Sequence, residues 1–381
     1  MRKGSDAMLW AILFGGMFLL AIAAILFLIR SVKHFQWIAM LSEKNKTAGW
    51  IVSILLVFLP LAFFWKVIGS MNAIIILLHL VVFLLFSNFI LYVIQKWRKK
   101  TFQHYYAGGI AIVVTVLYLA VGWIQAFHVW QTDYTVHTDK KVGNFKVALF
   151  ADSHVGTTFD GKGLEKHIEQ IQKQSPDILV IAGDFVDEDT SKKDMIDACK
   201  ALKNIQPTYG TYFVFGNHDK GKYSNGGRGY NGDDLVAELE KNGVTVLQDE
   251  NVLIDNRFYV IGRQDASEEL DFGGSRKSVQ ELTKDLDKSK FFILLDHQPR
   301  EYDKDAKAGV NLVLSGHTHG GQLIPLVQLN NLFHPAGDDR IYGMEQRKDT
   351  GYIVTSGISD WAIKFKTGCK SEYVLINIAG K

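Results

Sequence analysis

The chain has 381 residues and a formal net charge of +2, but charge is unevenly divided along it. Residues 1–136 contain 11 Lys and Arg against 3 Asp and Glu, whereas residues 137–381 contain 31 against 37, a net charge of −6. The acidic part has no basic tract, which disfavours nucleic acid as its partner. The sequence also contains no CxxC or Cys/His pattern, which excludes a zinc site made of thiolates.

Four apolar stretches in the first part each have close to the roughly 20 residues that a helix needs to cross a bilayer. They are Met8–Ile29, Ala48–Trp65, Ala73–Ile94 and Ala107–Phe127. The first is interpreted as an anchor and not as a signal peptide, because its apolar run is long and three further stretches follow. The sequence therefore predicts a four-helix transmembrane region within residues 1–136 of a multi-pass protein of the cell membrane.

Basic residues in the connecting loops predict the orientation of this region. The first and third loops together carry eight Lys and Arg, while the N-terminus and the second loop carry three. Loops one and three are therefore expected on the cytoplasmic side, which places the C-terminal domain outside the cytoplasm. His79 lies within the third stretch without a charged partner there, so we expect a neutral histidine bonded to a neighbouring helix and no transport pathway.

Residues 137–381 are predicted to form an α/β domain, because short apolar runs typical of strands alternate with segments typical of helices. The expected strands are Phe145–Ala151, Ile178–Ala182, Tyr212–Phe215, Phe258–Ile261, Phe291–Leu295, Leu312–Leu314, Tyr352–Thr355 and Tyr373–Ile378. The expected helices are Gly163–Gln174 with Asp160 as its N-cap, Lys192–Asn204, Asp233–Asn242 and Ser278–Asp287. Loops are expected at Gly221–Gly232 and Asp265–Arg276, and a linker of seventeen residues at His128–Asn144.

Polar side chains follow five of the expected strands, at the point where each strand ends. The sequences are Asp152-Ser153-His154, Gly183-Asp184, Gly216-Asn217-His218-Asp219, Asp296-His297 and Ser315-Gly316-His317-Thr318-His319-Gly320. Open α/β sheets bind ligands at the carboxyl ends of their strands, so these side chains are expected in one crevice. Carboxylate, amide and imidazole groups bind divalent ions, and two ions about 3.5–4 Å apart can share a water and hold a phosphoryl group. The set therefore predicts a two-metal site.

The ordered set D-x-H, G-D, G-N-H-D, H and G-H-x-H resembles the calcineurin-like metallophosphoesterase superfamily. It occurs here as ADSHVG, AGDFVD, GNHD, LDHQP and SGHTHGGQ, from about Phe145 to the C-terminus. The GHTHGGQ form, together with the N-terminal spans, is similar to the bacterial membrane-bound branch of that superfamily. The resemblance implies a four-layer α/β/β/α sandwich that holds two divalent metal ions, such as Mn, Fe or Zn.

The same resemblance implies a role for each matching residue. Asp152, His154 and His319 would hold one metal, Asn217, His297 and His317 would hold the other, and Asp184 would bridge both. His218 would face the substrate as a transition-state stabiliser or as the acid to the leaving group, and Asp219 would orient it.

Two further residues are weaker candidates for substrate binding. Gln322 follows the last metal motif and could touch phosphate or only its own loop, and Arg228 in the Gly-rich loop could clamp a phosphate or be a solvated loop residue. Cys199 and Cys369 are expected as separate buried thiols, although the sequence leaves a disulfide open.

The function that these features indicate is hydrolysis of a phosphoester or pyrophosphate bond by a two-metal-activated hydroxide in a membrane-anchored enzyme. Its partners would be the bilayer and a phosphorylated substrate, and a lipid-linked substrate is one option because the anchor holds the site near the bilayer. The alternative within the same chemistry is a cyclic-nucleotide or nucleic-acid phosphodiesterase. A non-catalytic metal-binding sensor is the alternative outside it, but that role predicts loss of His218 or of a ligand, and all of them are present.

Overall fold

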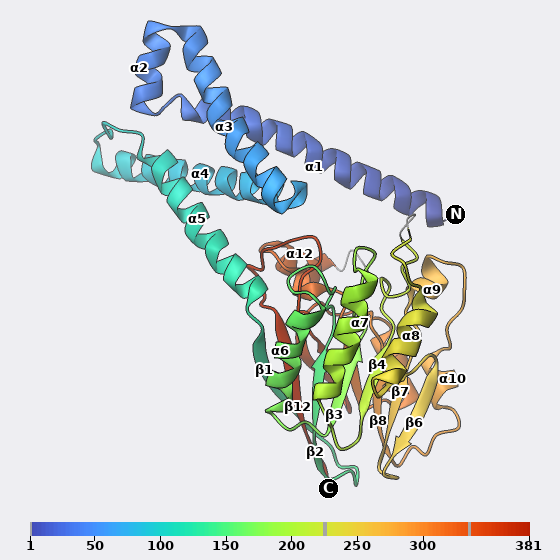
Figure 1. Cartoon of the computed structure of the whole chain (residues 1–381). Coiled ribbons are helices and arrows are strands. Elements are labelled where there is room, and N and C mark those ends of the chain that lie inside the picture. Colours follow the sequence, from blue (N-terminus) through green and yellow to red (C-terminus); the bar gives the residue numbers. More distant parts are fainter. Residues whose placement is uncertain (1, 224–226, 334–336) are drawn as a thin grey trace. The chain divides into compact units, whose positions relative to one another are not determined.

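The structure of the chain, a computed structural model, describes residues 2–223, 227–333 and 337–381 (Figure 1). It consists of two compact units, Met1–Gly122 and Trp123–Lys381. The division comes earlier in the sequence than the predicted boundary between residues 136 and 137, because residues 123–136 belong to the second unit.

The first unit is helical. It contains α1 (Arg2–Val32), α2 (Gln36–Lys44), α3 (Lys46–Ile68), α4 (Ser70–Arg98) and most of α5 (Tyr106–Phe127). Among the described residues, α3, α4 and α5 are long and apolar enough to cross a membrane. Phe18–Val32 and Gln36–Lys44 pass the same test only as a pair bent by 81°, so they count as a fourth span only if that bent pair crosses as one. In α4, His79 donates from Nδ1 to the carbonyl of Ile75 at 2.8 Å, within its own helix and not to a neighbouring one as expected.

Two six-stranded sheets form the centre of the second unit. The first has the strand order β1-β12-β2-β3-β4-β5 and the second has the order β10-β11-β9-β8-β7-β6. Their strands are β1 (Trp130–His137), β2 (Asn144–Phe150), β3 (Ile178–Ala182), β4 (Thr211–Val214), β5 (Val244–Val246), β6 (Glu250–Ile254), β7 (Phe258–Gly262), β8 (Phe291–Leu295), β9 (Leu312–Ser315), β10 (Gly343–Arg347), β11 (Thr350–Val354) and β12 (Glu372–Ala379). Strands β2 to β5 are parallel to one another, as are β7, β8, β9 and β11. The strand ends that carry the candidate ligands therefore lie at one edge of each sheet.

Helices cover the outer faces of both sheets. The first sheet carries α6 (Gly161–Gln172), α7 (Lys192–Ala201) with the 3-10 turn η1 (Leu202–Asn204), and α8 (Gly232–Lys241), whereas α10 (Val279–Thr283) and α11 (Tyr302–Ala308) pack on the second. Three further elements occur in the chain segments that connect strands. They are α9 (Ser267–Leu270), η2 (His319–Gly321) and α12 (Leu326–Phe333). The predicted N-cap of α6 is confirmed, because the Asp160 side chain accepts a hydrogen bond from the Gly163 amide at 2.7 Å.

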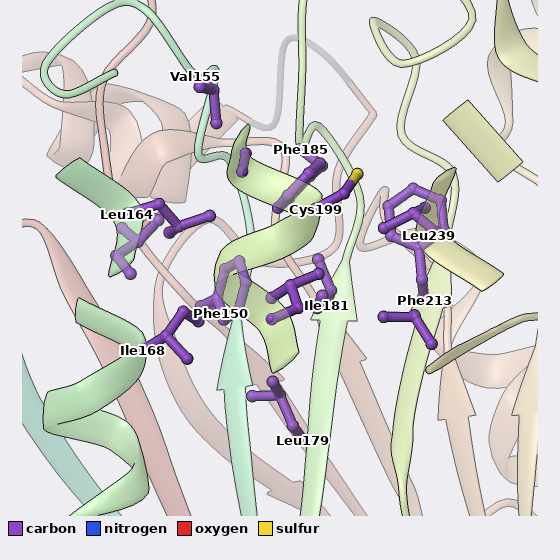
Figure 2. Packing of buried hydrophobic residues seen from close by; sticks show 14 of the residues in the cluster. Phe150, Val155, Leu164, Ile168, Leu179, Ile181, Phe185, Cys199, Phe213 and Leu239 are labelled. Atoms are coloured by element: carbon purple, nitrogen blue, oxygen red, sulfur yellow. The ribbon is translucent and has the colours of Figure 1, made fainter. Parts of the chain in front are cut away.

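Alternation along the strands produces the layers. In β2, Ala148 and Phe150 face the helices, while Val147 and Leu149 pack between the sheets. Figure 2 shows the helix side of the first sheet, where Phe150 lies near Ile168 of α6. A third apolar cluster packs β8 and β9 against α10 and α11. The predicted four-layer α/β/β/α sandwich is thus confirmed.

The expected strands all occur, with ends that differ by at most two residues, but the expected linker is wrong. Residues 130–137 form β1, which pairs in parallel with β12 from Trp130 opposite Glu372 to His137 opposite Ala379. This strand was not predicted from the sequence, although its residues alternate as in a half-buried strand. Its pairing partner lies far along the chain and gives no local signal. Both cysteines are buried and free, as expected. Part of the predicted loop Gly221–Gly232, residues 224–226, lies outside the described residues.

Candidate metal centre

The loops that follow β2, β3, β8 and β9 bring six of the predicted ligands into two adjacent groups. Asp152, His154 and His319 each offer one ligand atom within 4.8 Å of the others, and so do Asp184, His297 and His317. Asn217 joins the second group, since its Oδ1 lies 2.9 Å from His317 Nδ1. The structure therefore brings all seven predicted ligands together, and their binding of metal stays a prediction.

Asp184 lies where the two groups meet. Its Oδ2 is 3.1 Å from His297 Nε2 in the second group and 3.7 Å from His154 Nε2 in the first. Its Oδ1 accepts a hydrogen bond from the His218 amide at 2.9 Å. One carboxylate oxygen is thus held by the backbone while the other faces both groups, which is the arrangement a bridging ligand needs.

Several ring nitrogens at this site are buried without a hydrogen-bond partner. They are Nδ1 and Nε2 of His154, Nε2 of His297 and Nδ1 of His319. A buried polar atom without a partner is rare, because leaving it so costs about 1–3 kcal/mol. Nitrogen lone pairs that converge with carboxylate oxygens are the donors that divalent metals take, so these residues fit a pair of metal ions.

The His297 ring shows the fit most directly. Its Nδ1 donates to the carbonyl of Ala182 at 2.7 Å, so Nε2 is the nitrogen left to face Asp184 Oδ2, which lies 3.1 Å away. Burial alone would lower the pKa of His297, but the charge of Asp184 raises it well above its usual value. A proton on Nε2 places positive charge beside the Asp184 carboxylate, and a bound cation would do the same.

Two other rings stay neutral at this site. Burial and the neighbouring His297 lower the pKa of His317 to about 3, and burial with the neighbouring His154 lowers that of His319 well below its usual value. Burial raises the pKa of the Asp152 carboxyl to about 6. Neutral imidazoles keep the lone pairs that metal ligation needs, and a cation would favour the charged form of Asp152.

The backbone at this site is strained. The φ angles of five ligands are positive: 54° at Asp152, 35° at His154, 50° at Asp184, 73° at His317 and 48° at His319. A residue other than glycine in this region costs about 1–3 kcal/mol and persists only where its surroundings enforce it. Such strain concentrates at functional sites, and here it turns successive side chains into one space.

Glycines permit the close approach of the ligand loops. Gly183 has a φ of 85°, and a Cβ there would lie 2.6 Å from His297 Nδ1. A Cβ at Gly216 would lie 2.2 Å from Asp184 Oδ1. Any side chain at either position would therefore displace a ligand.

His218 lies beside the two groups, and a residue that the sequence did not indicate holds its ring. Its Nδ1 is 2.7 Å from Glu188 Oε2. Burial alone would lower the pKa of His218, but the hydrogen bond to Glu188 and the charge of Asp184 raise it to about 9. Glu188 thus favours the charged form of the ring, from which Nε2 could donate a proton.

Asp219 does not orient His218 as expected. Its carboxylate accepts hydrogen bonds from the amides of Asp184 (2.8 Å), Val186 (3.0 Å) and Gly216 (2.7 Å). A carboxylate that accepts several amides replaces regular backbone pairing in a buried turn. Asp219 thus fixes the backbone that carries the bridging Asp184, and Glu188 takes the role predicted for Asp219.

The two weaker candidates bind their own loops. Arg228 donates to the carbonyls of Asp187 (2.8 Å), Tyr230 (3.4 Å) and Asp219. The Gln322 side chain donates to Asp360 Oδ1 at 3.2 Å. These contacts favour structural roles, and substrate binding by either residue stays a prediction.

Four residues near the site were missed by sequence reasoning. Asp187 Oδ2 lies 3.5 Å from His154 Nδ1, and Glu188 bonds His218. The rings of Tyr223 and Trp361 lie 5.3 and 5.6 Å from the His218 ring, measured between centroids. Asp187 ends the AGDFVD motif and Glu188 follows it, so this acidic pair could have been noticed, whereas Trp361 lies in a loop with no motif.

Comparison with known proteins agrees with this geometry. The sequence profile described as calcineurin-like phosphoesterase matches residues 145–321. An uncharacterized metallophosphoesterase of Aquifex aeolicus is 30% identical over 275 residues, which cover 70% of this chain and 98% of that protein. Another from Campylobacter jejuni is 32% identical over 244 residues, which cover 62% of this chain and 60% of that protein.

A relative from cattle is described as a transmembrane protein with metallophosphoesterase domain. It is 27% identical over 298 residues, which cover 73% of this chain and 63% of that protein. The chain thus spans about three-fifths of the Campylobacter and cattle proteins.

The position of Asp184 predicts that its loss affects both metals. Asp184→Ala should lose both ions and nearly all turnover while the unit stays folded, since it removes the oxygen that faces both groups. His218→Ala should keep the metals and lose most activity. Metal analysis of the purified variants, with circular dichroism as the folding check, measures the difference. Equal metal loss in both variants would show that His218 is a ligand.

The Glu188 contact predicts a change in pH dependence. Glu188→Gln keeps the shape but removes a charge that raises the pKa of His218, so that pKa falls. If His218 donates a proton, the alkaline limit of activity should move to lower pH and kcat should drop by roughly 10-fold or more, with metal content unchanged. The exposed neighbour Asp189→Asn is the control. A profile that stays in place in Glu188→Gln would remove Glu188 from the mechanism.

Proposed function

Because the chain belongs to the calcineurin-like phosphoesterase family, we propose that it hydrolyses a phosphoester or pyrophosphate bond at the strand ends of its second unit. The observation that carries this proposal is the meeting of two ligand groups at Asp184, with His218 beside them. Metal-dependent phosphoester hydrolysis uses such a pair of sites together with a proton donor.

Each part of the site has a role in this reaction. Two divalent ions would supply a nucleophile at neutral pH and neutralise charge on the phosphoryl oxygens. Asp184 keeps the two ligand groups at a fixed separation, and Asp219 fixes the Asp184 backbone. His218 gives its proton to the oxygen of the leaving group, and Glu188 holds the ring in position and stabilises its charged form.

A cyclic-nucleotide or nucleic-acid phosphodiesterase is the alternative within this chemistry. The net charge of −6 in residues 137–381 disfavours a polyanionic partner. A non-catalytic sensor would use the ligand groups without His218. The position of His218 beside the two ligand groups, with its ring held by Glu188, supports the enzyme, because metal binding alone does not need such a side chain there.

We further propose that the protein is a multi-pass protein of the cell membrane with its catalytic unit outside the cytoplasm. Three helices, or four with the bent pair, support the multi-pass anchor. The basic loops support the orientation. A lipid-linked phosphoester is the favoured substrate, since β1 follows directly after α5 and leaves almost no free linker between the last span and the domain.

Hydrolysis can be tested on the full chain in detergent. With Mn²⁺ present, we expect turnover of at least one member of a panel containing an aryl phosphomonoester, an aryl phosphodiester, inorganic pyrophosphate and phospholipid headgroups. Chelation should abolish this turnover, and Asp184→Ala provides the blank. A metal-loaded protein that turns over none of the panel would favour the sensor.

Orientation can be tested with a reporter enzyme that is active only outside the cytoplasm. Fused after Lys381 it should be active, and inserted between Lys96 and Lys100 it should be silent, because those basic residues are expected to stay in the cytoplasm. The reverse pair of results would place the catalytic unit in the cytoplasm.

A further inference from the structure

The last turn of α5 is fastened to a loop of the catalytic unit. The amide and hydroxyl of Ser371 donate to the carbonyls of Gln125 (2.8 Å) and Ala126 (2.7 Å). Trp123 packs edge-on against Phe365, with ring centroids 5.8 Å apart. Residues 123–127 belong to the second unit, so the end of the last span is fixed to residues 365–371.

The same loop holds the segment that follows the last metal ligand. The amides of Thr367 and Gly368 both donate to the carbonyl of Gln322 at 2.9 Å. The Cys369 thiol donates to the carbonyl of His319 at 3.2 Å. Residues 365–371 therefore connect the end of the span directly with the His319 loop.

A buried ion pair extends this connection to the other side of the site. Lys366 Nζ lies 3.3 Å from Asp360 Oδ1, and both side chains are fully buried. The same oxygen of Asp360 accepts the hydrogen bond from Gln322, and Trp361 comes next in the chain, with its ring against His218. Hydrogen bonds and this ion pair thus link the end of the span, the loop after His319 and the segment that carries Trp361 into one framework.

Strand directions place this framework at the catalytic edge. β12 is antiparallel to β2, with Val374 opposite Leu149, and β1 is parallel to β12. The start of β1 therefore lies beside the carboxyl end of β2, which leads into Asp152. Within the second unit, Figure 1 shows α12 at this same end of the sandwich.

The helix α12 presents its apolar residues outward. Val327 is buried and lies against Gly321 and Gly368, whereas Leu326, Leu329 and Leu332 are exposed by 44%, 44% and 71%. Residues 322–333 contain no charged side chain. A surface helix of a soluble protein usually turns its leucines toward the core. The exposed leucines of α12 therefore indicate an apolar partner or a membrane.

Two more exposed side chains extend this face. Ile324 precedes the helix, and Trp361 is joined to it through Asp360 and Gln322. We call Ile324, Leu326, Leu329, Leu332 and Trp361 the apolar rim. It borders the metal centre on the side where the last span ends.

We propose that the apolar rim inserts into the lipid bilayer beside the last span, so that the metal centre opens at the level of the lipid headgroups. The end of α5 is bonded to residues 365–371, and these residues also hold the carbonyl of Gln322, two residues before the start of the rim. Helices that have one apolar and one polar face can lie in the interface between headgroups and acyl chains. Trp123 and Trp130 flank the end of the span, as aromatic residues do at membrane surfaces.

This inference rests on the proposed function only in its consequence for the substrate. With the rim in the bilayer, a headgroup phosphate would reach the metal centre while its acyl chains stay in the membrane. The aromatic rings of Trp361 and Tyr223 beside His218 would then contact the apolar side of the leaving group.

Insertion can be measured independently of activity. Both native cysteines are buried, so a thiol introduced by Leu329→Cys can be labelled selectively with an environment-sensitive dye. The full chain is reconstituted into vesicles of phosphatidylethanolamine and phosphatidylglycerol that carry a nitroxide-labelled phosphatidylcholine. We expect a blue-shifted emission and loss of most of the fluorescence through quenching. The matched control is Leu253→Cys on β6, which is 41% exposed and lies outside the rim, and it should keep its fluorescence.

The outcomes separate this inference from the proposed function. A blue shift without quenching would show that α12 is covered by protein, either the other helices or a second copy, and would overturn the inference. So would a label at position 329 that behaves like the one at 253. Quenching together with no hydrolysis by the same sample would support the rim and overturn the proposed function. Leu329→Glu should reduce turnover of vesicle lipid while leaving a soluble aryl phosphoester unaffected.

Discussion

The carboxylate of Asp184 has one oxygen 3.1 Å from His297 and 3.7 Å from His154, and the other on the amide of His218. Each neighbour of this group depends on its position. The two ligand groups meet there, and its charge raises the pKa of both His297 and His218.

Much of the surrounding structure keeps that carboxylate in place. Asp219 gathers three amides behind it, and Gly216 leaves no side chain in its way. The left-handed conformations of five ligands would each be unfavourable in isolation. Burial of the three apolar clusters of the sandwich stabilises the fold and offsets the energetic cost of this backbone strain. The local sequence alone would not favour these backbone conformations, and the rest of the fold enforces them.

The sequence allowed the candidate ligands to be placed in one site because each follows an apolar strand, and parallel strands bring their ends together. It failed where contacts depend on residues distant in sequence. The alternating residues of β1 have no local signal for their pairing with β12. Asp219 lies next to His218 in sequence but turns toward backbone amides, while Glu188, thirty residues earlier, reaches the ring. Adjacency along the chain was a poor guide to which acid holds which histidine.

The position of β12 in the first sheet also has a consequence for how the protein is made. β12 lies between β1 and β2, yet it is synthesised after every other strand of that sheet. Until residues 372–379 emerge from the ribosome, β1 and β2 both present unpaired edges, and such edges can pair with other chains. The first sheet therefore stays incomplete until the last of its strands in the sequence has been synthesised.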